Sequence, residues 1–275
     1  RGERRAPLPS MVSFERQAAH RPYRKEDVAE VLALAISRGE VGLNQAESAI
    51  FYDMDAVKAT LLELKTVFPP HFMHTFAVKS CPLPPVMCFM TENGLGMESA
   101  SLSELQLSLR CGCPPQMLMF DSPAKTRSEI REALSLGVQI NVDNFDELGR
   151  VVSLRKELEA EGTPSASRVA FRFNPLVGAG TIKALSVSDG KSKFGVPLTE
   201  ANKERLIQCF ATLPFLDGLH IHVGSQGFSL DQLTRGVATC VALADEIDQR
   251  VCSGRVRVID IGGGLPMNYG SRGGQ

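Results

Sequence analysis

Residues that start and stop helices recur at short intervals along most of this chain. Four polar residues each stand three positions before a Glu or Gln. In this arrangement the first side chain accepts a hydrogen bond from a free backbone N–H, and the second reaches back to the N–H of the first residue. Three glycines fall where the preceding helices should end. The pairs are Ser101 with Glu104, Thr126 with Glu129, Asn144 with Glu147 and Ser229 with Gln232, and the glycines are Gly94, Gly112 and Gly137.

Short apolar runs alternate with these helices from about Ser48 onward. Such alternation predicts an α/β fold with a parallel sheet, either an open doubly wound sheet or a closed (β/α)8 barrel. A barrel needs eight strands and roughly 250 residues. We find seven strands, so we expect the eighth beyond Gln275 or in a stretch that the pattern misses. The predicted strands are Thr75–Val78, Leu95–Glu98, Met117–Phe120, Val138–Val142, Arg168–Phe173, Gly218–Val223 and Val256–Ile261, and the predicted helices include Arg24–Gly39, Asp55–Val67, Ser128–Leu136 and Asp146–Ala160.

The net charge of the chain limits its possible partners, and its cysteine content indicates the cellular compartment. Thirty Lys and Arg against 31 Asp and Glu give a formal net charge of −1, which argues against a cationic surface that grips nucleic acid. No apolar run approaches the ~20 residues that cross a bilayer, and Arg1 to Ser10 lack the apolar segment of a secretory signal. The 7 cysteines cannot all pair with one another, so we expect a reducing, cytoplasmic environment. Organellar targeting stays open, because the sequence does not begin with Met.

Polar residues at the ends of the predicted strands are the candidates for chemistry, because functional groups of a barrel gather at the C-terminal ends of its strands. Lys79 follows the first strand, Glu98 closes the second and His222 closes the sixth. The seventh strand ends in Asp260, followed by the glycine run Gly262 to Gly264. Three glycines leave backbone N–H groups unshielded, which suits an anion such as a phosphate, and the run is equally compatible with a plain tight turn.

Most of these residues also have a structural interpretation. Lys79 either extends to solvent or pairs with a carboxylate, or its amine is desolvated and acts as a nucleophile toward an aldehyde. His220 and His222 share one side of a strand and are either hydrogen-bonded core histidines or functional groups. Cys111 and Cys113 have no second ligand pair at zinc spacing and no nearby His, so we interpret them as loop thiols.

Six motifs, in a fixed order, resemble the fold-type III pyridoxal-phosphate decarboxylases, the group that contains the diaminopimelate, ornithine and arginine decarboxylases. The resemblance extends from about Ser48 to Tyr269. It implies a (β/α)8 TIM-type barrel whose cofactor is pyridoxal 5′-phosphate. The motifs are Phe76-Ala77-Val78-Lys79, Gly96-Met97-Glu98-Ser99-Ala100-Ser101, Phe171-Arg172-Phe173-Asn174-Pro175, Ser192-Lys193-Phe194-Gly195, Gly218-Leu219-His220-Ile221-His222-Val223-Gly224-Ser225-Gln226 and Asp260-Ile261-Gly262-Gly263-Gly264.

The resemblance implies a role for each matching position. Lys79 would attach covalently to the cofactor, and His222 would stack on one face of its pyridine ring. The phosphate would be held by Ser225 together with Gly262, Gly263 and Gly264. Arg172 and Glu98 would lie near the ring and Lys79. No residue is expected to bind a metal.

Three features differ from the family. Glu98 stands where the family usually has Asp, and Ser80-Cys81 follows Lys79 where the family has Ala-Asn or Cys-Asn. The family's Glu-Pro-Gly-Arg-like segment, whose Glu pairs with the pyridine nitrogen, and its C-terminal β-domain are not found in the sequence. We therefore expect an N-terminal extension over residues 1–44 and an incomplete barrel over residues 45–275. The eighth strand and the β-domain would lie beyond Gln275, which puts the activity of this 275-residue chain alone in question.

The resulting hypothesis is a pyridoxal-phosphate-dependent amino-acid decarboxylase that is a homodimer when full-length. The segments His222 to Gln226 and Arg172 to Pro175 look more like those of diaminopimelate decarboxylases, whereas Glu98 to Ser101 is closer to the ornithine type. The preferred substrate is therefore meso-diaminopimelate, which would give lysine, with ornithine or arginine as the alternatives. Two other classes stay open. One is a metal-dependent barrel hydrolase with His220 and His222 as ligands, and the other is a degenerate homologue that binds only cofactor or a partner.

Overall fold

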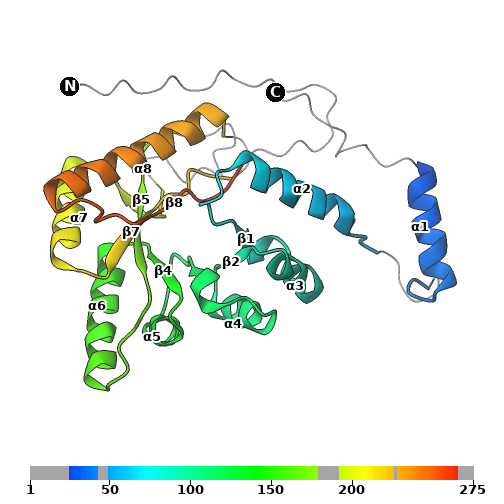
Figure 1. Cartoon of the computed structure of the whole chain (residues 1–275), viewed down its shortest axis with the longest axis horizontal. Helices are drawn as coiled ribbons and strands as arrows, with labels where there is room; N and C mark the ends of the chain where they lie inside the picture. The colour runs from blue at the N-terminus through cyan, green and yellow to red at the C-terminus, as the bar shows by residue number, and fades with distance from the viewer. Residues whose placement is uncertain (1–24, 43–48, 179–191, 226–227, 266–275) are drawn as a thin grey trace. The chain divides into compact units, whose positions relative to one another are not determined.

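The computed structural model describes residues 25–42, 49–178, 192–225 and 228–265, which are coloured in Figure 1. The chain divides into two compact units, Met73–Tyr269 and a unit made of Arg1–Phe72 with Gly270–Gln275. More than half of the expected extension over residues 1–44 lies outside the described residues, as do Gln226 and Tyr269 of the motif region. The expected domain boundary at residue 44 stays a prediction.

The described part of the smaller unit contains two helices. α1 (Lys25–Ser37) and α2 (Met54–Val67) confirm the helices predicted from the spacing of apolar residues. α2 begins after Asp53, whose side chain accepts a hydrogen bond of 2.9 Å from the N–H of Ala56. Among the described helices of both units, none is long and apolar enough to span a membrane.

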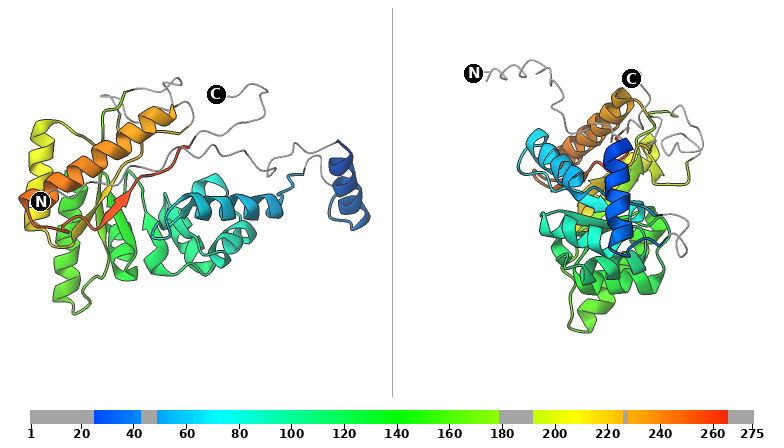
Figure 2. Two further views of the ribbon diagram at one scale, coloured as in Figure 1. Left: turned by 45° about the horizontal axis from the view of Figure 1, so that its top comes forward. Right: turned by 90° about the vertical axis from the view of Figure 1, so that its right-hand side faces the viewer.

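In the larger unit, strands and helices alternate along the chain, and Figure 1 shows the helices around the outside of the strands. Helix α8, orange in Figure 2, is joined to α7 by an ion pair of 2.6 Å between Arg250 and Glu204. The strands are β1 (Thr75–Ala77), β2 (Gly96–Ser99), β3 (Leu118–Phe120), β4 (Gln139–Val142), β5 (Val169–Asn174), β6 (Val196–Pro197), β7 (Leu216–His220) and β8 (Val258–Asp260). The helices are α3 (Pro84–Glu92), α4 (Leu102–Arg110), α5 (Arg127–Leu136), α6 (Phe145–Ala160), α7 (Glu200–Thr212) and α8 (Leu230–Arg250), with 3₁₀ turns at Val78–Ser80 and Pro115–Met117.

The strands form a parallel sheet in the order β1-β2-β3-β4-β5-β7-β8, and β6 pairs with β5 beside this path. The fold is thus a TIM-like α/β barrel, and within the described residues its sheet is open between β1 and β8. All seven predicted strands are confirmed. The pattern missed β6, because two residues are too few to show an alternation. The predicted end of the sixth strand was also wrong, because pairing along β7 stops at His220 and leaves His222 beyond the strand.

The predicted helix caps are present at all four positions. Ser101, Thr126, Asn144 and Ser229 each accept a hydrogen bond from the N–H three residues later. The reciprocal bond to the cap's own N–H forms at Thr126 and Ser229. At the other two helices this part of the prediction was wrong, because the Glu accepts from the residue before the cap, Ala100 (2.7 Å) or Asp143 (3.4 Å). The glycines also end helices as predicted, with Gly94, Gly112 and Gly137 all in the left-handed region.

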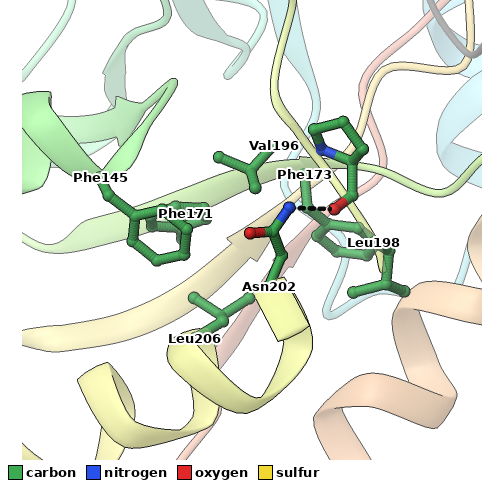
Figure 3. Close-up of a pocket in the computed structure, with 8 residues that line it drawn as sticks. Phe145, Phe171, Phe173, Val196, Leu198, Asn202 and Leu206 are labelled. Atoms are coloured by element: carbon green, nitrogen blue, oxygen red, sulfur yellow. Dashed lines mark hydrogen bonds between the residues drawn. The ribbon is translucent and has the colours of Figure 1, made fainter. Parts of the chain in front are cut away.

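The two faces of β5 have opposite chemistry. All six residues of this strand are buried, as expected for a central parallel strand that is covered on both sides. Because successive side chains point to opposite faces, Phe171 and Phe173 lie on one face, and Arg172 and Asn174 on the other. Figure 3 shows Phe171 and Phe173 in an apolar pocket with residues of α6, α7 and β6, where Asn202 donates a hydrogen bond of 2.9 Å to the carbonyl of Pro197. The helix-covered face of β5 is therefore apolar, and the polar side chains of this strand face the interior of the barrel.

Candidate functional site

The structure brings the predicted strand-end residues to one edge of the sheet. All strand pairs are parallel, so their C-terminal ends lie at the same edge. The register also places Arg172, His220 and Asp260 opposite one another on β5, β7 and β8. The edge carries Lys79 after β1, Glu98 on β2, Asp121 after β3, Asp143 after β4, Arg172 on β5, His220 on β7, His222 after β7 and Asp260 at the end of β8.

Lys79 lies in the 3₁₀ turn after β1 and faces Glu98 of β2. Its Nζ is 3.5 Å from Glu98 Oε1, and the register pairs Glu98 with Ala77 across the two strands. The Lys79 side chain is 56% exposed. Lys79 is therefore a solvent-accessible lysine paired with a carboxylate, and the interpretation as a desolvated amine is wrong for the protein without a bound ligand. Burial raises the pKa of Glu98, and the Lys79 charge offsets part of this rise. The contact with Glu98 thus leaves this amine open to a ligand.

Arg172 lies between two acidic residues in the interior. Its Nη1 atom is 3.8 Å from Asp121 Oδ1 and 3.6 Å from Asp143 Oδ1, and its guanidinium lies 5.1 Å from the centre of the Phe194 ring. The Asp143 carboxylate also accepts a hydrogen bond of 3.1 Å from the N–H of Gly195. The segment that contains Phe194 and Gly195 is therefore fixed to the same charged cluster as Arg172.

His220 is buried between two carboxylates. Its Nε2 atom is 3.3 Å from Asp121 Oδ2 and its Nδ1 atom is 3.1 Å from Asp260 Oδ2. Burial alone would lower the pKa of His220, but the two carboxylates outweigh it and raise this pKa to about 10. Burial acts to raise the pKa values of Asp121 and Asp260. The His220 charge outweighs this effect and is the chief reason that both pKa values are lowered.

His222 is two residues further along the chain and has the opposite protonation state. Burial lowers the pKa of His222 to about 4, and the positive charges of His220, Arg172 and Lys79 act in the same direction. Its Nδ1 atom accepts a hydrogen bond of 3.3 Å from the N–H of Gly263. The remaining proton of the neutral ring is therefore assigned to Nε2.

The glycine run after β8 packs against the segment that follows β7. Gly262 has φ 68° and donates a hydrogen bond of 2.9 Å to Asp260 Oδ1, and a Cβ here would lie 2.5 Å from the Ile221 carbonyl oxygen. A Cβ on Gly264, which has φ 89°, would lie 1.7 Å from the carbonyl oxygen of Gly224. Both positions thus require glycine, whereas a Cβ on Gly263 would meet nothing within 4 Å.

These glycines form a backbone cradle of the kind that suits a phosphate. The close approach of Gly264 to Gly224 brings the run next to Ser225, whose Cα would be 3.3 Å from a Gly264 Cβ. Open space is left at Gly263, where a Cβ would meet nothing within 4 Å, close to exposed backbone and to the Ser225 hydroxyl, and such groups bind phosphate oxygens. The residues present therefore fit pyridoxal 5′-phosphate, with the exposed amine of Lys79 for its aldehyde.

The sequence predictions found Lys79, Glu98, Arg172, His222, Ser225 and the three glycines, and the structure places all of them at this edge. They missed Asp121 and Asp143, although each directly follows a predicted strand, and the rule that selected Lys79 would have selected both. His220 was considered as a core or metal-binding residue, and its place between two carboxylates was not foreseen. In the ranges that the structure describes, no three His, Cys, Asp or Glu side chains are grouped so that they could hold a metal ion.

A second buried ion pair, between Lys125 and Glu147, is linked to this cluster through Asn141. Lys125 Nζ is 2.5 Å from Glu147 Oε1, and both side chains are inaccessible to solvent. Lys125 also donates a hydrogen bond of 2.8 Å to the carbonyl of Asn141. The Asn141 side chain in turn donates a hydrogen bond of 2.8 Å to Asp260 Oδ2. This pair was not predictable from the sequence, because neither residue stands at a strand end.

Residues 54–274 match the family model of the pyridoxal-dependent decarboxylases, specifically their pyridoxal binding domain. The chain is 27% identical over 253 residues to diaminopimelate decarboxylase of Aquifex aeolicus, a match that covers 91% of this chain and 58% of that protein. It is 32% identical over 203 residues to diaminopimelate decarboxylase of Pseudomonas fluorescens, covering 73% of this chain and 47% of that protein. The fold superposes on a crystal structure of a Helicobacter pylori diaminopimelate decarboxylase variant complexed with L-lysine, with a TM-score of 0.72 at 25% identity over 84% of this chain and 58% of that one. The chain thus spans about half the length of the relatives that it matches.

Proposed function

The chain belongs to the pyridoxal-dependent decarboxylases through their pyridoxal binding domain, and on this premise we propose that the protein decarboxylates an amino acid with pyridoxal 5′-phosphate as its cofactor. The observation that carries the proposal is the exposed amine of Lys79, held at 3.5 Å from Glu98 at the same edge of the sheet as the glycine cradle. When bound, the cofactor supplies an electron sink for the pair of electrons that the departing carboxylate leaves behind.

The roles of the chain's own residues follow from their surroundings. Lys79 is the nucleophile toward the cofactor aldehyde, because its amine is accessible and at the mouth of β1. His222 provides a neutral, flat ring beside the glycine run, so it can cover one face of an aromatic ligand without adding a charge. The phosphate would lie against Gly262, Gly263, Gly264 and Ser225 and accept from the Gly264 N–H and the Ser225 hydroxyl, because the N–H groups of Gly262 and Gly263 already donate to Asp260 Oδ1 and His222 Nδ1. Together these contacts would keep the cofactor in one orientation for the reaction.

Arg172 and Glu98 complete the proposed site with less direct roles. Arg172 is fixed by Asp121, Asp143 and the ring of Phe194, so its guanidinium provides a permanent positive charge at a constant position. Glu98 balances the charge of Lys79 when the amine is protonated. Because burial raises the pKa of Glu98, this carboxyl is also suited to hold a proton when the Lys79 amine is neutral and the Glu98 negative charge has no cation to balance.

The preferred substrate in this proposal is meso-diaminopimelate, and the product is lysine. The relatives named above are diaminopimelate decarboxylases, and the segments around His222 and Arg172 favour the same substrate. The segment Glu98 to Ser101 is closer to the ornithine type, so ornithine and arginine remain the competing substrates. We further propose that the working protein is a cytoplasmic homodimer that does not act on nucleic acid, in line with its balanced charge and its unpaired cysteines.

The test is carbon dioxide release by purified protein that contains this sequence, measured with all three amino acids on one preparation. The proposal expects the highest kcat/KM with meso-diaminopimelate and a loss of about 10⁴-fold or more in Lys79→Ala, the scale seen when a covalent nucleophile is removed. Lys156→Ala on the exposed surface of α6 is the matched control and should keep full activity. A higher kcat/KM for ornithine or arginine would reverse the substrate, and full activity of Lys79→Ala would refute the mechanism.

A further inference from the structure

A continuous line of polar contacts crosses the interior of the barrel from the glycine run to the segment around Gly195. It passes through side chains of five different strand ends, and His220 is its middle member. The line runs from the N–H of Gly262 to Asp260 (2.9 Å), to His220 (3.1 Å), to Asp121 (3.3 Å), to Arg172 (3.8 Å), to Asp143 (3.6 Å) and to the N–H of Gly195 (3.1 Å). Since the glycine run and Arg172 both belong to the proposed cofactor site, a change at His220 acts on both.

The position of His220 between Asp121 and Asp260 is favourable only when both ring nitrogens carry a proton. A neutral imidazole has a single N–H donor, whereas Asp121 and Asp260 present one carboxylate to each ring nitrogen. With one proton on the ring, one nitrogen lone pair would face a carboxylate oxygen in a buried position, which is strongly unfavourable. The imidazolium form instead places a positive charge between the two carboxylates, at 3.3 Å from Asp121 and 3.1 Å from Asp260, and offsets their mutual repulsion.

We propose that His220 is a positioning residue, a permanent cation that locks the glycine run and Arg172 into one rigid unit. This inference rests on the proposed function, because it assigns the purpose of the lock to cofactor binding at that same site. Asp260 passes the constraint to Gly262, and Asp121 passes it to Arg172. The charge of His220 also acts on His222, where it lowers the pKa and favours the neutral ring that the site needs.

Other groups around His220 do not supply this charge in its place. Asn141 reaches Asp260 as a neutral donor, and Arg172, the register partner of His220 on β5, is paired with Asp121 Oδ1 and Asp143. Lys125 is engaged by Glu147 and backbone carbonyls. The titratable and charged groups that surround His220 are Asp121 after β3, Asp143 after β4, Arg172 on β5, His222 on its own segment, Asp260 on β8, Glu98 on β2 and Lys79 after β1.

The first test uses cofactor-free protein and does not depend on any activity. Nitrogen-15 NMR of the histidine side chains should show one imidazole with both nitrogens protonated from pH 6 to pH 9, and this signal should be absent in His220→Gln. A ring that loses a proton near pH 6.5, the ordinary value for histidine, would overturn the proposal. Since the measurement needs neither cofactor nor substrate, it would stand even if the proposed decarboxylation failed.

The second test separates positioning from simple structural support. His220→Gln keeps one donor and removes the charge, so it should weaken pyridoxal-phosphate binding by roughly tenfold or more, the effect of losing a charge-assisted contact. Adding Asp121→Asn removes one of the two repelling carboxylates and should restore part of the lost affinity. His71→Gln, on an exposed histidine of the smaller unit, is the matched control and should bind normally.

The outcomes of this second test are distinct. Affinity measured by absorbance should fall in His220→Gln and recover partly in the double variant, while the thermal midpoint identifies any loss of folding. If His220→Gln unfolds, the double variant still tests the proposal, because partial recovery of both folding and affinity is expected only when charge balance is the cause. Unchanged affinity in His220→Gln, or a double variant worse than the single one, would overturn the proposal.

Discussion

The two faces of β5 show how this chain separates stability from chemistry. On the outer face, Phe171 and Phe173 are buried against helices, and the Phe171 ring lies 4.9 Å from the ring of Phe145. On the inner face, Arg172 is equally buried but lies between two carboxylates. Apolar burial stabilises the fold, whereas buried charges contribute little net stability and are strongly unfavourable when one partner is lost. Alternate residues of β5 thus serve stability or chemistry, so substitutions on the outer face should change the stability and leave cofactor binding unchanged.

The largest expected effect on stability is on the outer face. Phe171→Ala removes a fully buried aromatic ring, so the free energy of unfolding should fall by roughly 3–5 kcal/mol. Urea denaturation measures this loss, and Phe51→Ala, at a side chain that is 50% exposed, should change it by less than about 0.5 kcal/mol. In protein that remains folded, pyridoxal-phosphate affinity should be unchanged. A tenfold loss of affinity would contradict the separation of the two faces.

A smaller loss of stability is expected from the inner ion pair of Lys125 and Glu147. Lys125→Met leaves the buried Glu147 carboxylate without its cation, which should lower the free energy of unfolding by about 3 kcal/mol. Combining it with Glu147→Leu removes the uncompensated charge and should recover most of the loss. Urea denaturation of the two single variants and the double variant gives the coupling between the two residues. Additive losses would show that the pair does not act as a unit.

The smallest effect concerns the two histidines of one segment, whose pKa values shift in opposite directions. The raised pKa of His220 makes its contribution to stability complete below pH 6.5 and lost as pH rises toward about 10. The lowered pKa of His222 makes its contribution complete above pH 6.5 and lost as pH falls toward about 4. Between pH 7 and pH 8 the free energy of unfolding should therefore fall by about 1 kcal/mol through His220.

The pH dependence is measured by urea denaturation at several pH values in the cofactor-free protein. His220→Gln should lack the decline above pH 7, and the control His71→Gln should keep it. The decline below pH 6.5 includes Asp121 and Asp260 as well as His222, because the pKa values of both carboxyls are lowered in the folded protein. A decline above pH 7 that is the same in His220→Gln would mean that another group causes it.

Much of the fold was predictable because its signals are local. Caps such as Thr126 and stop residues such as Gly137 act within one helical turn, so the sequence shows them directly. Seven strands followed from short apolar runs between these helices. The end of β7 was not predictable, because it depends on where pairing with β5 and β8 stops. Strand pairing is set by residues far away along the chain, and no local pattern records it.

The candidate site was predictable to a similar extent. Lys79, His222 and the glycine run stand at strand ends and in motifs, and the structure brings them to one edge. The setting of His220 was not predictable, because Asp121 reaches it from β3, which β4 and β5 separate from β7 in the sheet order. Such contacts across the interior depend on the curvature of the sheet as well as on its order.

Lys79 is the residue to which we propose that pyridoxal 5′-phosphate attaches. Sodium borohydride reduction of the cofactor-loaded protein makes the bond between the cofactor and a lysine permanent, and peptide mass spectrometry then locates the label. We expect a single labelled site at Lys79, with the label lost in Lys79→Ala and retained in Lys156→Ala. A label on another lysine, or no label at saturating cofactor, would contradict it.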